Sequence, residues 1–400
     1  MKKILIIKMR FPYPIFSGTD HVSFNLIKAL SEEHEVSLIC HVRSDENIKD
    51  IAVLKQYCKE VIVARYPVIK TVWQRIWKKI QREFLFLFCL VPRDVIDNIS
   101  TEIEKIIKDH LSSNKYDIVQ IEYFYAAKYR KYIRNSVSII LSNDAYYETV
   151  KQFYLYEKNI IKKVIRFFEY IVTKRYELRA YKLFDWVFFI SRDDLKIIER
   201  DNILKQTKVI PVAMEACQTS KQCEIVPYSM VFVGGMQALF NRDAVIYFCR
   251  DIYPLIHSEI PEATFTIVGS SPGEDILEFA KEPGITVTGS VRDVAPYVSK
   301  AAIYVAPLRI GTGIKTKILE AMSMKKAIVT TSMGVQGLSV ENGKELFIED
   351  DRISFAKRVI DLLREPEKCK AIGLKAAEYF EKKHNVASIK ADILDAYRGL

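Results

Sequence analysis

Apolar residues are arranged in two alternating patterns along the chain. Short runs of aliphatic and β-branched residues, such as KILIIKM at 3–9 and EVSLICH at 35–41, end at polar or glycine residues. Longer stretches place apolar residues three and four positions apart, which is the spacing of one helix face. The first pattern predicts buried strands, and the second predicts amphipathic helices. Their alternation predicts an α/β fold built on parallel sheets.

The first half of the chain opens in the order strand, loop, helix, strand. The strand at 3–9 leads through the proline-containing loop FPYPIFSGTD into a helix and then into the strand at 35–41. Further strands are expected at 61–64, 116–121, 137–141 and 186–190, and helices at 94–110 and across 150–182. This order predicts a doubly wound sheet. The loop after the first strand is not GxGxxG, which argues against a dehydrogenase.

A change of character at 207–227 predicts a linker between two domains. This stretch contains two prolines and scattered polar residues. Beyond it, the strands at 230–233, 264–268 and 286–288 are each followed directly by glycine. The helices expected in this half are 241–257, 294–300, 351–364, 369–383 and 387–400. The repeat of strand, glycine and helix predicts a second parallel sheet.

The second half centres on the stretch 304–331, YVAPLRIGTGIKTKILEAMSMKKAIVTT. A strand at 303–306 leads into a loop with Gly311, Thr312 and Gly313, then into an amphipathic helix and a second strand. This order predicts a βαβ unit. Its loop leaves backbone N–H groups free at a helix N-terminus, where anions bind.

Charged side chains on this loop and helix suit a nucleotide sugar. Arg309, Lys315 and Lys317 supply cations for phosphate. Glu320 supplies a carboxylate, which can accept hydrogen bonds from paired sugar hydroxyls. We therefore predict a nucleotide-sugar site. For Lys315 the alternative is a solvated lysine at a helix end.

Length and composition favour a folded protein with two cores. The chain has 400 residues, and a hydrophobic content of 49% argues against long disordered stretches. Seven cysteines occur without CxxC or a histidine cluster, so we interpret them as reduced structural residues of a cytoplasmic protein. The start MKKILIIKM is interpreted as a strand rather than a signal peptide. No run of 18 apolar residues occurs, so no membrane-spanning helix is expected.

The net charge of +10 lies entirely in the first half. Residues 1–205 hold 36 Lys and Arg against 26 Asp and Glu, whereas residues 206–400 hold 24 of each. An anionic membrane, a nucleic acid or an anionic substrate could balance a basic half. The stretch 150–182 mixes basic and aromatic residues, as single-stranded nucleic-acid sites do, but no RNA-binding or zinc motif accompanies it. We therefore expect no nucleic acid partner.

A basic helix with tryptophans is predicted within 68–90. Its apolar residues share one helical face, and its basic residues fill most of the other. The apolar residues are Ile69, Val72, Trp73, Ile76, Trp77 and Ile80, and the basic residues are Lys70, Arg75, Lys78, Lys79 and Arg82. This arrangement suits an anionic membrane surface, which the basic stretch 158–182 would extend. The alternative is a helix packed on its own domain. The aromatic run 84–90 is expected in the core or under a loop.

Polar residues follow two strands of the first half. Asn143 and Asp144 lie either where ligands bind in such folds or at the cap of the next helix. Ser191 is predicted to cap a helix that begins with Asp193 and Asp194. These two acids suit a helix N-terminus better than a metal site.

Several motifs resemble the GT-B retaining glycosyltransferases of family 4. They are FVGGMQALFNRDAV, FTIVGSSP, VTGSVRDVAPYV and APLRIGTGIKTKILEAMSMKKAIVTTSMGVQGL, and they cover about 230–365 in the family's order and spacing. FPYPIFSGTDHVSFNLIKAL and KRYELRAYKLFDWVFFISRDD are also similar to the family. The resemblance implies a GT-B fold, in which two Rossmann-like doubly wound domains face each other across a cleft. The implied ranges are 1–206 for the acceptor domain, 207–383 for the nucleotide-sugar domain, and 384–400 for a helix that crosses back to the first domain.

The resemblance also implies roles for particular residues. Glu320 would bind the ribose hydroxyls, and Gly235 would let the backbone approach the diphosphate. Val291 and Arg292 would lie at the base pocket. Gly18 would belong to the loop that closes over the donor.

The chain departs from the family's pattern at the diphosphate. The family's first glutamate falls at Thr312, and its arginine and lysine fall at Gly235 and Asn241. Lys315, helped by Arg309, is the candidate replacement cation.

The family's histidine in the first domain is replaced around 142–144, and Asn143 and Asp144 are therefore candidate catalytic residues together with Lys315. The resemblance implies a retaining, metal-independent glycosyltransferase of the hexosyltransferase type, with no cofactor. Its acceptor would be a saccharide or a lipid-linked saccharide, at the inner face of the membrane, in the assembly of a surface polysaccharide such as capsule or O-antigen. The alternatives are a GT-B nucleotide-sugar epimerase and a non-catalytic nucleotide-sugar-binding protein of the same fold.

Overall fold

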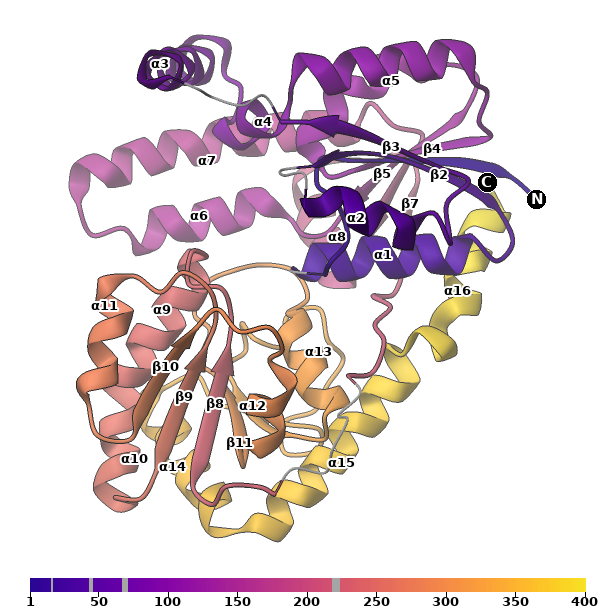
Figure 1. The fold of residues 1–400 in the computed structure, drawn as a ribbon. Helices are drawn as coiled ribbons and strands as arrows, with labels where there is room; N and C mark the ends of the chain where they lie inside the picture. The colour runs from indigo at the N-terminus through magenta and orange to yellow at the C-terminus, as the bar shows by residue number, and fades with distance from the viewer. Residues whose placement is uncertain (16, 43–45, 67–70, 218–223) are drawn as a thin grey trace. The chain divides into compact units, whose positions relative to one another are not determined.

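The computed structural model describes residues 1–15, 17–42, 46–66, 71–217 and 224–400, which form two units (Figure 1). Unit 1 contains Met1–Ala213 and Lys390–Leu400, and unit 2 contains Met214–Ile389. Each unit holds one parallel sheet flanked by helices. The predicted fold class, α/β with two Rossmann-like doubly wound domains, is confirmed.

The sheet of unit 1 has seven strands in the order β3-β2-β1-β4-β5-β6-β7. The strands are β1 (Lys3–Lys8), β2 (Glu35–Val42), β3 (Glu60–Arg65), β4 (Ile118–Glu122), β5 (Val137–Ser142), β6 (Trp186–Phe189) and β7 (Thr207–Val209). Helices α1 (Gly18–Leu30) and α5 (Thr101–Ser113) lie on opposite sides of this sheet in Figure 1. Because both faces are covered, the strands are continuous aliphatic runs rather than alternating ones.

The other helical segments of unit 1 are α2 (Glu46–Leu54), α3 (Val72–Cys89), α4 (Arg93–Asn98), η1 (Phe124–Tyr132), α6 (Tyr146–Tyr156), α7 (Ile160–Tyr181) and α8 (Arg192–Asp201). Two helices predicted as continuous are broken. The helix expected at 94–110 is split because the Ser100 side chain caps α5, and the stretch 150–182 is split where Asn159 caps α7. Ser191 caps α8, as predicted.

Helix α3 does not pack its apolar face on unit 1. The exposed fractions of Trp73 and Trp77 are 79% and 70%, and Val72, Ile76 and Ile80 are also exposed. The alternative of a helix packed on its own domain is therefore wrong for this face. The aromatic run 84–90 was expected in the core, yet Phe86 is its only residue in the buried class. Ile69 and Lys70 lie outside the described residues.

Strand β7 falls inside the stretch 207–227 that the sequence predicts as a linker. It pairs with β6, with Lys208 beside Phe188. A three-residue strand followed by a proline has little pattern to distinguish it from a linker. The six cysteines in the described part of the chain are free, and Cys223 lies outside that part.

The sheet of unit 2 has six strands in the order β10-β9-β8-β11-β12-β13. The strands are β8 (Ser229–Val233), β9 (Thr264–Val268), β10 (Ile285–Gly289), β11 (Ile303–Ala306), β12 (Ala327–Thr330) and β13 (Phe347–Ile348). The helices are α9 (Leu239–Tyr247), α10 (Tyr253–Glu259), α11 (Glu274–Leu277), α12 (Ala295–Lys300), α13 (Thr316–Ser323), α14 (Arg352–Arg364), α15 (Pro366–Lys383) and α16 (Val386–Arg398). The helix expected at 241–257 is interrupted by a π-helical segment, Phe248–Ile252, and η3 (Glu278–Lys281) follows α11.

The end of α16 belongs to unit 1. The Lys2 ammonium donates to the carbonyl oxygen of Tyr397 at 3.0 Å, and Lys390 pairs with Glu32 at 2.6 Å. Within the described ranges, no helix is long and apolar enough to cross a bilayer.

Candidate functional site

The sheet of unit 2 reverses its strand order between β8 and β11, which are neighbours. In open parallel sheets, ligands bind beyond the carboxyl ends of the strands at such a reversal. Gly235 lies just after β8, and the loop from Arg309 to Gly313 lies just after β11. The structure thus brings these predicted residues to one edge of the sheet.

The loop after β11 needs glycine at two positions. Gly311 has φ 121° and Gly313 has φ 72°, both in the left-handed region. The Lys315 ammonium donates to the carbonyl oxygens of Thr312 and Gly313, at 2.8 Å each. Because Lys315 is buried, the alternative of a solvated lysine is wrong. In this structure its ammonium stabilises the loop by bonding to two of the loop's backbone carbonyl oxygens.

Arg309 is held by α9. Its guanidinium makes two hydrogen bonds to the Asp243 carboxylate, with Nε to Oδ2 at 3.0 Å and Nη2 to Oδ1 at 2.6 Å. It also lies 4.1 Å from the ring centroid of Tyr247. A bidentate pair of this kind fixes the direction of the side chain.

Lys317 reaches the same edge from α13. Its Nζ donates to the side-chain oxygen of Asn241, whose Nδ2 donates to the carbonyl oxygen of Gly235 at 2.9 Å. A Cβ on Gly234 would lie 2.8 Å from this Nζ, so the ammonium rests against the backbone that leaves β8. The sequence predicts Lys317 as one of the cations for phosphate, whereas the candidate for the diphosphate contact is Lys315.

The electrostatics of Lys317 are unusual. Removal from water lowers the pKa of this ammonium to about 7, from an ordinary value of 10.5. The Glu320 carboxylate opposes this shift, and the Lys315 ammonium adds to it. A lysine with so low a pKa is half-charged near neutral pH, and an anion bound beside it would restore the full charge.

Glu320 lies one turn along α13 from Lys317. It is close enough to Tyr304 of β11 that its charge, after burial, contributes to raising the pKa of that phenol. Val291 and Arg292, the predicted base-pocket residues, follow β10, where Gly289 has φ 69°. Val291 is partly buried and Arg292 is exposed.

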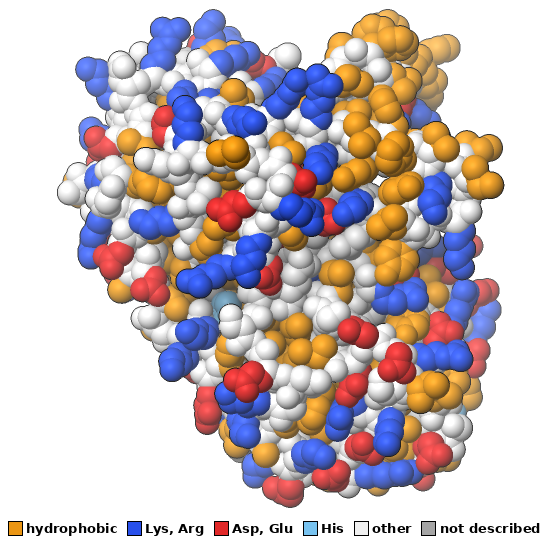
Figure 2. Space-filling model, turned by 180° about the vertical axis from the view of Figure 1, so that it is seen from behind, with side chains coloured by type: hydrophobic (Ala, Val, Ile, Leu, Met, Phe, Trp, Pro, Cys, Tyr) orange, Lys and Arg blue, Asp and Glu red, His pale blue; other side chains and the backbone are white. Residues whose placement is uncertain are grey.

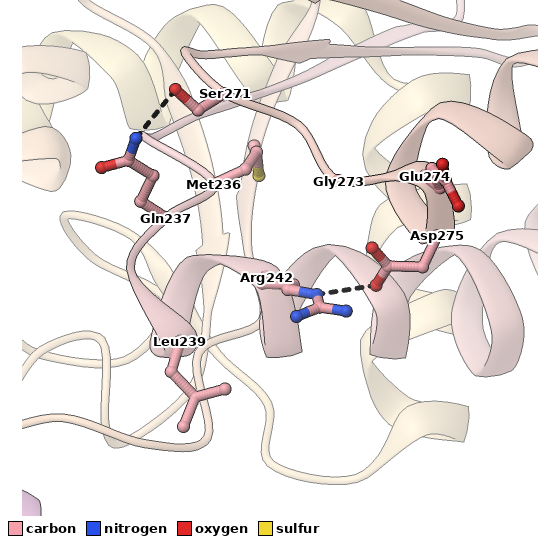
Figure 3. A pocket seen from close by; sticks show the side chains of 8 residues that line it. All are labelled: Met236, Gln237, Leu239, Arg242, Ser271, Gly273, Glu274 and Asp275. Carbon is pink, nitrogen blue, oxygen red and sulfur yellow. Dashed lines mark hydrogen bonds and ion pairs between the residues drawn. The ribbon is translucent and has the colours of Figure 1, made fainter. Parts of the chain in front are cut away.

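A cavity of about 610 Å³ lies beside the loops that follow β8 and β9 (Figure 3). Across it, Arg242 Nε pairs with Asp275 at 2.7 Å and Gln237 Nε2 donates to Ser271 Oγ at 3.0 Å. Its volume is in the range of small-molecule sites. None of its lining residues was predicted, although Met236 directly follows Gly235. Gln237 and Ser271 are on loops, whereas Arg242 and Asp275 belong to α9 and α11, and their pairing across 33 positions leaves no periodic signal in the sequence.

In unit 1 the structure places Gly18 as the first residue of α1, directly after the cap Ser17. Asn143 and Asp144 follow β5, and neither caps α6. Asn143 is buried, and its Oδ1 has no hydrogen-bond partner among the described residues. Asp144 accepts a hydrogen bond from the Tyr123 hydroxyl.

Two other acidic side chains accept hydrogen bonds from backbone N–H groups at the start of α6. Glu177 accepts hydrogen bonds from the backbone N–H groups of Tyr146 and Tyr147, at 3.1 and 2.9 Å. Asp194 accepts from Ala145 at 3.0 Å. Burial raises the pKa of Glu177 to about 8, and the charge of the nearby Asp144 adds to the shift. Their contacts give Glu177 and Asp194 local structural roles.

A buried ion cluster in unit 1 was not predicted. The Lys8 ammonium, at the end of β1, lies 3.2 Å from Glu122 Oε2, at the end of β4. It also donates to Ser23 Oγ at 2.6 Å and lies 3.7 Å from Asp20 Oδ1. The signal available in the sequence was a lysine inside an otherwise aliphatic strand. In the described part of the chain, no group of three or more His, Cys, Asp or Glu residues could hold a metal ion.

Comparison with known proteins connects unit 2 to one family. Residues 227–365 match the family model described as glycosyl transferases group 1. A curated relative from Klebsiella pneumoniae, named "Uncharacterized 44.6 kDa protein in cps region", is 23% identical and covers 98% of this chain and 99% of its own length.

The fold as a whole is similar to several solved structures. Sucrose-phosphate synthase from Thermosynechococcus elongatus has a TM-score of 0.72 at 15% identity, covering 100% of this chain and 99% of that one. A TarM mutant from S. aureus, in complex with UDP and α-GlcNAc-glycerol among its ligands, has a TM-score of 0.71 at 11% identity, covering 99% of each chain. HepE from Anabaena with UDP and glucose has a TM-score of 0.67 at 13% identity, covering 100% of each chain. The fold is GT-B, and the match over 227–365 supports a group 1 glycosyltransferase.

Proposed function

We propose that this protein is a retaining glycosyltransferase that moves a hexose from a nucleotide-sugar donor to a saccharide or lipid-linked saccharide. The observation that carries the proposal is the edge of the unit 2 sheet at β8 and β11. There a glycine-bounded loop, several cations and the Glu320 carboxylate occur together, within the range that matches group 1 glycosyltransferases. Two of the similar structures contain UDP, which supports a nucleotide donor.

In the proposed reaction, the residues at this edge of the sheet stabilise the leaving nucleoside diphosphate. Negative charge develops on the diphosphate as its bond to the sugar breaks, and fixed backbone dipoles and cations stabilise that charge. Arg309 and Lys315 are the cations proposed from the sequence, with backbone amides at Gly235 and Gly311–Gly313. Glu320 would bind the ribose hydroxyls. We propose a reaction without a metal or other cofactor, because no DxD suited to Mg²⁺ follows a strand in the sequence.

The acceptor is proposed to be lipid-linked and to belong to surface polysaccharide assembly. The relative named for a cps region supports the second point. Exposed apolar side chains on one end of unit 1 support the first, and Figure 2 shows hydrophobic side chains gathered on this part of the surface. On α3 they are Val72, Trp73, Ile76, Trp77, Ile80, Phe84, Leu87 and Phe88, and on α7 they are Ile160, Ile161, Val164, Ile165, Phe167 and Ile171.

The two helices meet at this end, where the rings of Phe86 and Phe168 are 5.3 Å apart. Exposed Arg75, Lys78 and Lys79 lie among the apolar residues of α3. Tryptophan with lysine and arginine is typical of helices in a bilayer interface. Because a second copy would present the same basic side chains, charge favours an anionic bilayer over self-association. We propose a cytoplasmic protein bound peripherally to the inner membrane face.

The membrane proposal is tested by liposome co-sedimentation with and without anionic lipid. Wild-type protein should sediment with anionic liposomes, and the double variant Trp73→Glu, Trp77→Glu should not. Ile203→Glu is the matched control, because Ile203 is an apolar residue of unit 1 that is 91% exposed. Equal sedimentation of wild type and double variant would contradict a membrane surface on α3.

The catalytic proposal is tested in two steps. UDP-, GDP- and ADP-sugars are first screened by thermal shift, since a bound donor raises the melting temperature. The donor found is then incubated alone and with saccharide and lipid-linked saccharide acceptors. Transfer with retained anomeric configuration is expected. Conversion of donor in the absence of acceptor would favour an epimerase, and binding without any turnover would favour a non-catalytic protein.

A further inference from the structure

Lys317 is a cation whose hydrogen bonds are incomplete. An ammonium has three N–H donors. In the described part of the chain, Lys317 makes one side-chain hydrogen bond, to Asn241, and no carboxylate oxygen lies within 4.0 Å. The rings of Phe232 and Phe240 lie 4.7 and 5.7 Å from its Nζ. Cation–π attraction to these rings offsets part of the cost of removing the ammonium from water, but its hydrogen bonds stay incomplete. A perturbed cation of this kind is typical of a functional site.

The position of this ammonium is fixed by its surroundings. Asn241 holds it through Oδ1 and is itself anchored on the carbonyl oxygen of Gly235. Gly234 has no Cβ, which would otherwise lie 2.8 Å from the ammonium. A lysine on α13 therefore reaches the residues that leave β8, where the strand order of the sheet reverses.

The two neighbouring cations are engaged differently. Lys315 donates to two backbone carbonyl oxygens of its own loop, and Arg309 makes a bidentate pair with Asp243. For either to bind a phosphate directly, these bonds would have to be shared or broken. Lys317 needs no such change, because two of its three donors are uncommitted to side chains or backbone carbonyls in the described structure.

We propose that Lys317 is the residue of unit 2 that contacts the diphosphate of the donor directly, while Lys315 positions the loop. This inference rests on the proposed function and deepens it. The ligand chemistry is a nucleoside diphosphate, whose oxygens accept the two remaining N–H bonds and supply the negative charge that the buried ammonium lacks. The low pKa of Lys317 fits a cation that becomes fully charged when the anion binds.

The test is calorimetric titration of UDP, GDP and ADP into wild type and Lys317→Met, with melting temperatures measured on the same samples. Methionine keeps the length of the stem and removes the charge. The variant should bind the preferred nucleotide tenfold or more weakly, at an equal or higher melting temperature. Lys375→Met, at an exposed lysine of α15, is the control and should bind like wild type.

Each outcome decides the inference. Unchanged affinity in Lys317→Met would overturn it. Weaker binding together with a lower melting temperature would assign Lys317 a structural role and would also overturn it. If wild type binds none of the three nucleotides, the proposed function fails first and the inference fails with it.

Discussion

Each unit contains a lysine where its sheet reverses strand order, and the two lysines have different surroundings: Lys8 is buried, and Lys317 is partly buried. Lys8 ends β1 in unit 1 and lies against Glu122 and Asp20, with further bonds to Ser23 and to a backbone carbonyl oxygen. Lys317 reaches the end of β8 in unit 2 and, among the residues that the structure describes, makes one side-chain hydrogen bond, to an uncharged amide. Within the described residues, Lys8 has a carboxylate at salt-bridge distance, whereas Lys317 feels the Glu320 charge without such a contact.

This difference separates a structural lysine from a candidate ligand lysine. The three N–H donors of the Lys8 ammonium bond to Thr19 O, Ser23 Oγ and Glu122 Oε2, so a ligand would have to break one of these bonds to reach it. An ammonium beside an amide and two aromatic rings can still bind an anion through its remaining N–H donors. The comparison therefore supports our proposal of an anion site at the reversal in unit 2, although both sheets have the same topology at that point.

Substitution of Lys8 is expected to have the largest effect on stability. Lys8→Met should destabilise the protein by about 3–5 kcal/mol, because it leaves the Glu122 carboxylate buried without its cation. Urea unfolding of the full chain, followed by circular dichroism, measures this loss. The double variant Lys8→Met, Glu122→Leu should recover much of it. A Lys8→Met protein as stable as wild type would contradict the structural role of Lys8 and so the contrast with Lys317.

Lys317→Met should change stability in the opposite direction, by less. The pKa of Lys317 is lower in the folded protein, about 7, than in the unfolded chain, near 10.5, so the unfolded state binds more protons between these values. The cost of the buried charge is therefore fully present below about pH 7 and is relieved as pH rises toward 10.5. The variant should melt higher than wild type at pH 6, and the gain should shrink by pH 9.

Thermal melts of both proteins at pH 6, 7.5 and 9 measure that gain, with Lys375→Met as control. A gain that grows with pH, or a lower melting temperature at every pH, would show that Lys317 is a satisfied structural group like Lys8.

The smallest expected effect on stability is at Glu320, which extends the comparison to the carboxylates. Glu122 accepts from Lys8 and Ser23, whereas Glu320 shapes the charge around Lys317 without a salt bridge to it. Glu320→Gln should weaken donor binding by about tenfold, because hydrogen bonds to a charged acceptor contribute about 1.5–3 kcal/mol. The melting temperature should change little. Unchanged calorimetric affinity for the nucleoside diphosphate would remove the ribose role.

The sequence predicted the elements of unit 2 well where burial is complete. Ile303–Ala306 and Thr264–Val268 were expected at their observed bounds, because strands in a covered parallel sheet are uninterrupted apolar runs. The stretches 94–110 and 241–257 were each expected as one helix, but the structure breaks each of them. The apolar period continues across the Ser100 cap and the π-helical segment at Phe248, so the pattern alone cannot show the break.

The site was predicted in part for a similar reason. The loop glycines and the cations of 309–317 are visible in the sequence, but their partners are not. Lys317 meets Asn241, which is 76 positions away, and Lys315 turns back onto its own loop. For α3, the period predicted the helix and its two faces, but whether the apolar face is covered depends on the tertiary structure.

The most direct test of the central claim is the number of protons taken up when a nucleoside diphosphate binds. Calorimetric titration at pH 8 in two buffers with different ionisation enthalpies gives this number. If the diphosphate binds at Lys317, wild type should take up close to one proton per nucleotide, because the neutral amine becomes an ammonium. Lys317→Met should take up none. Equal proton uptake by both proteins, or no uptake by wild type, would contradict a direct contact between the diphosphate and Lys317.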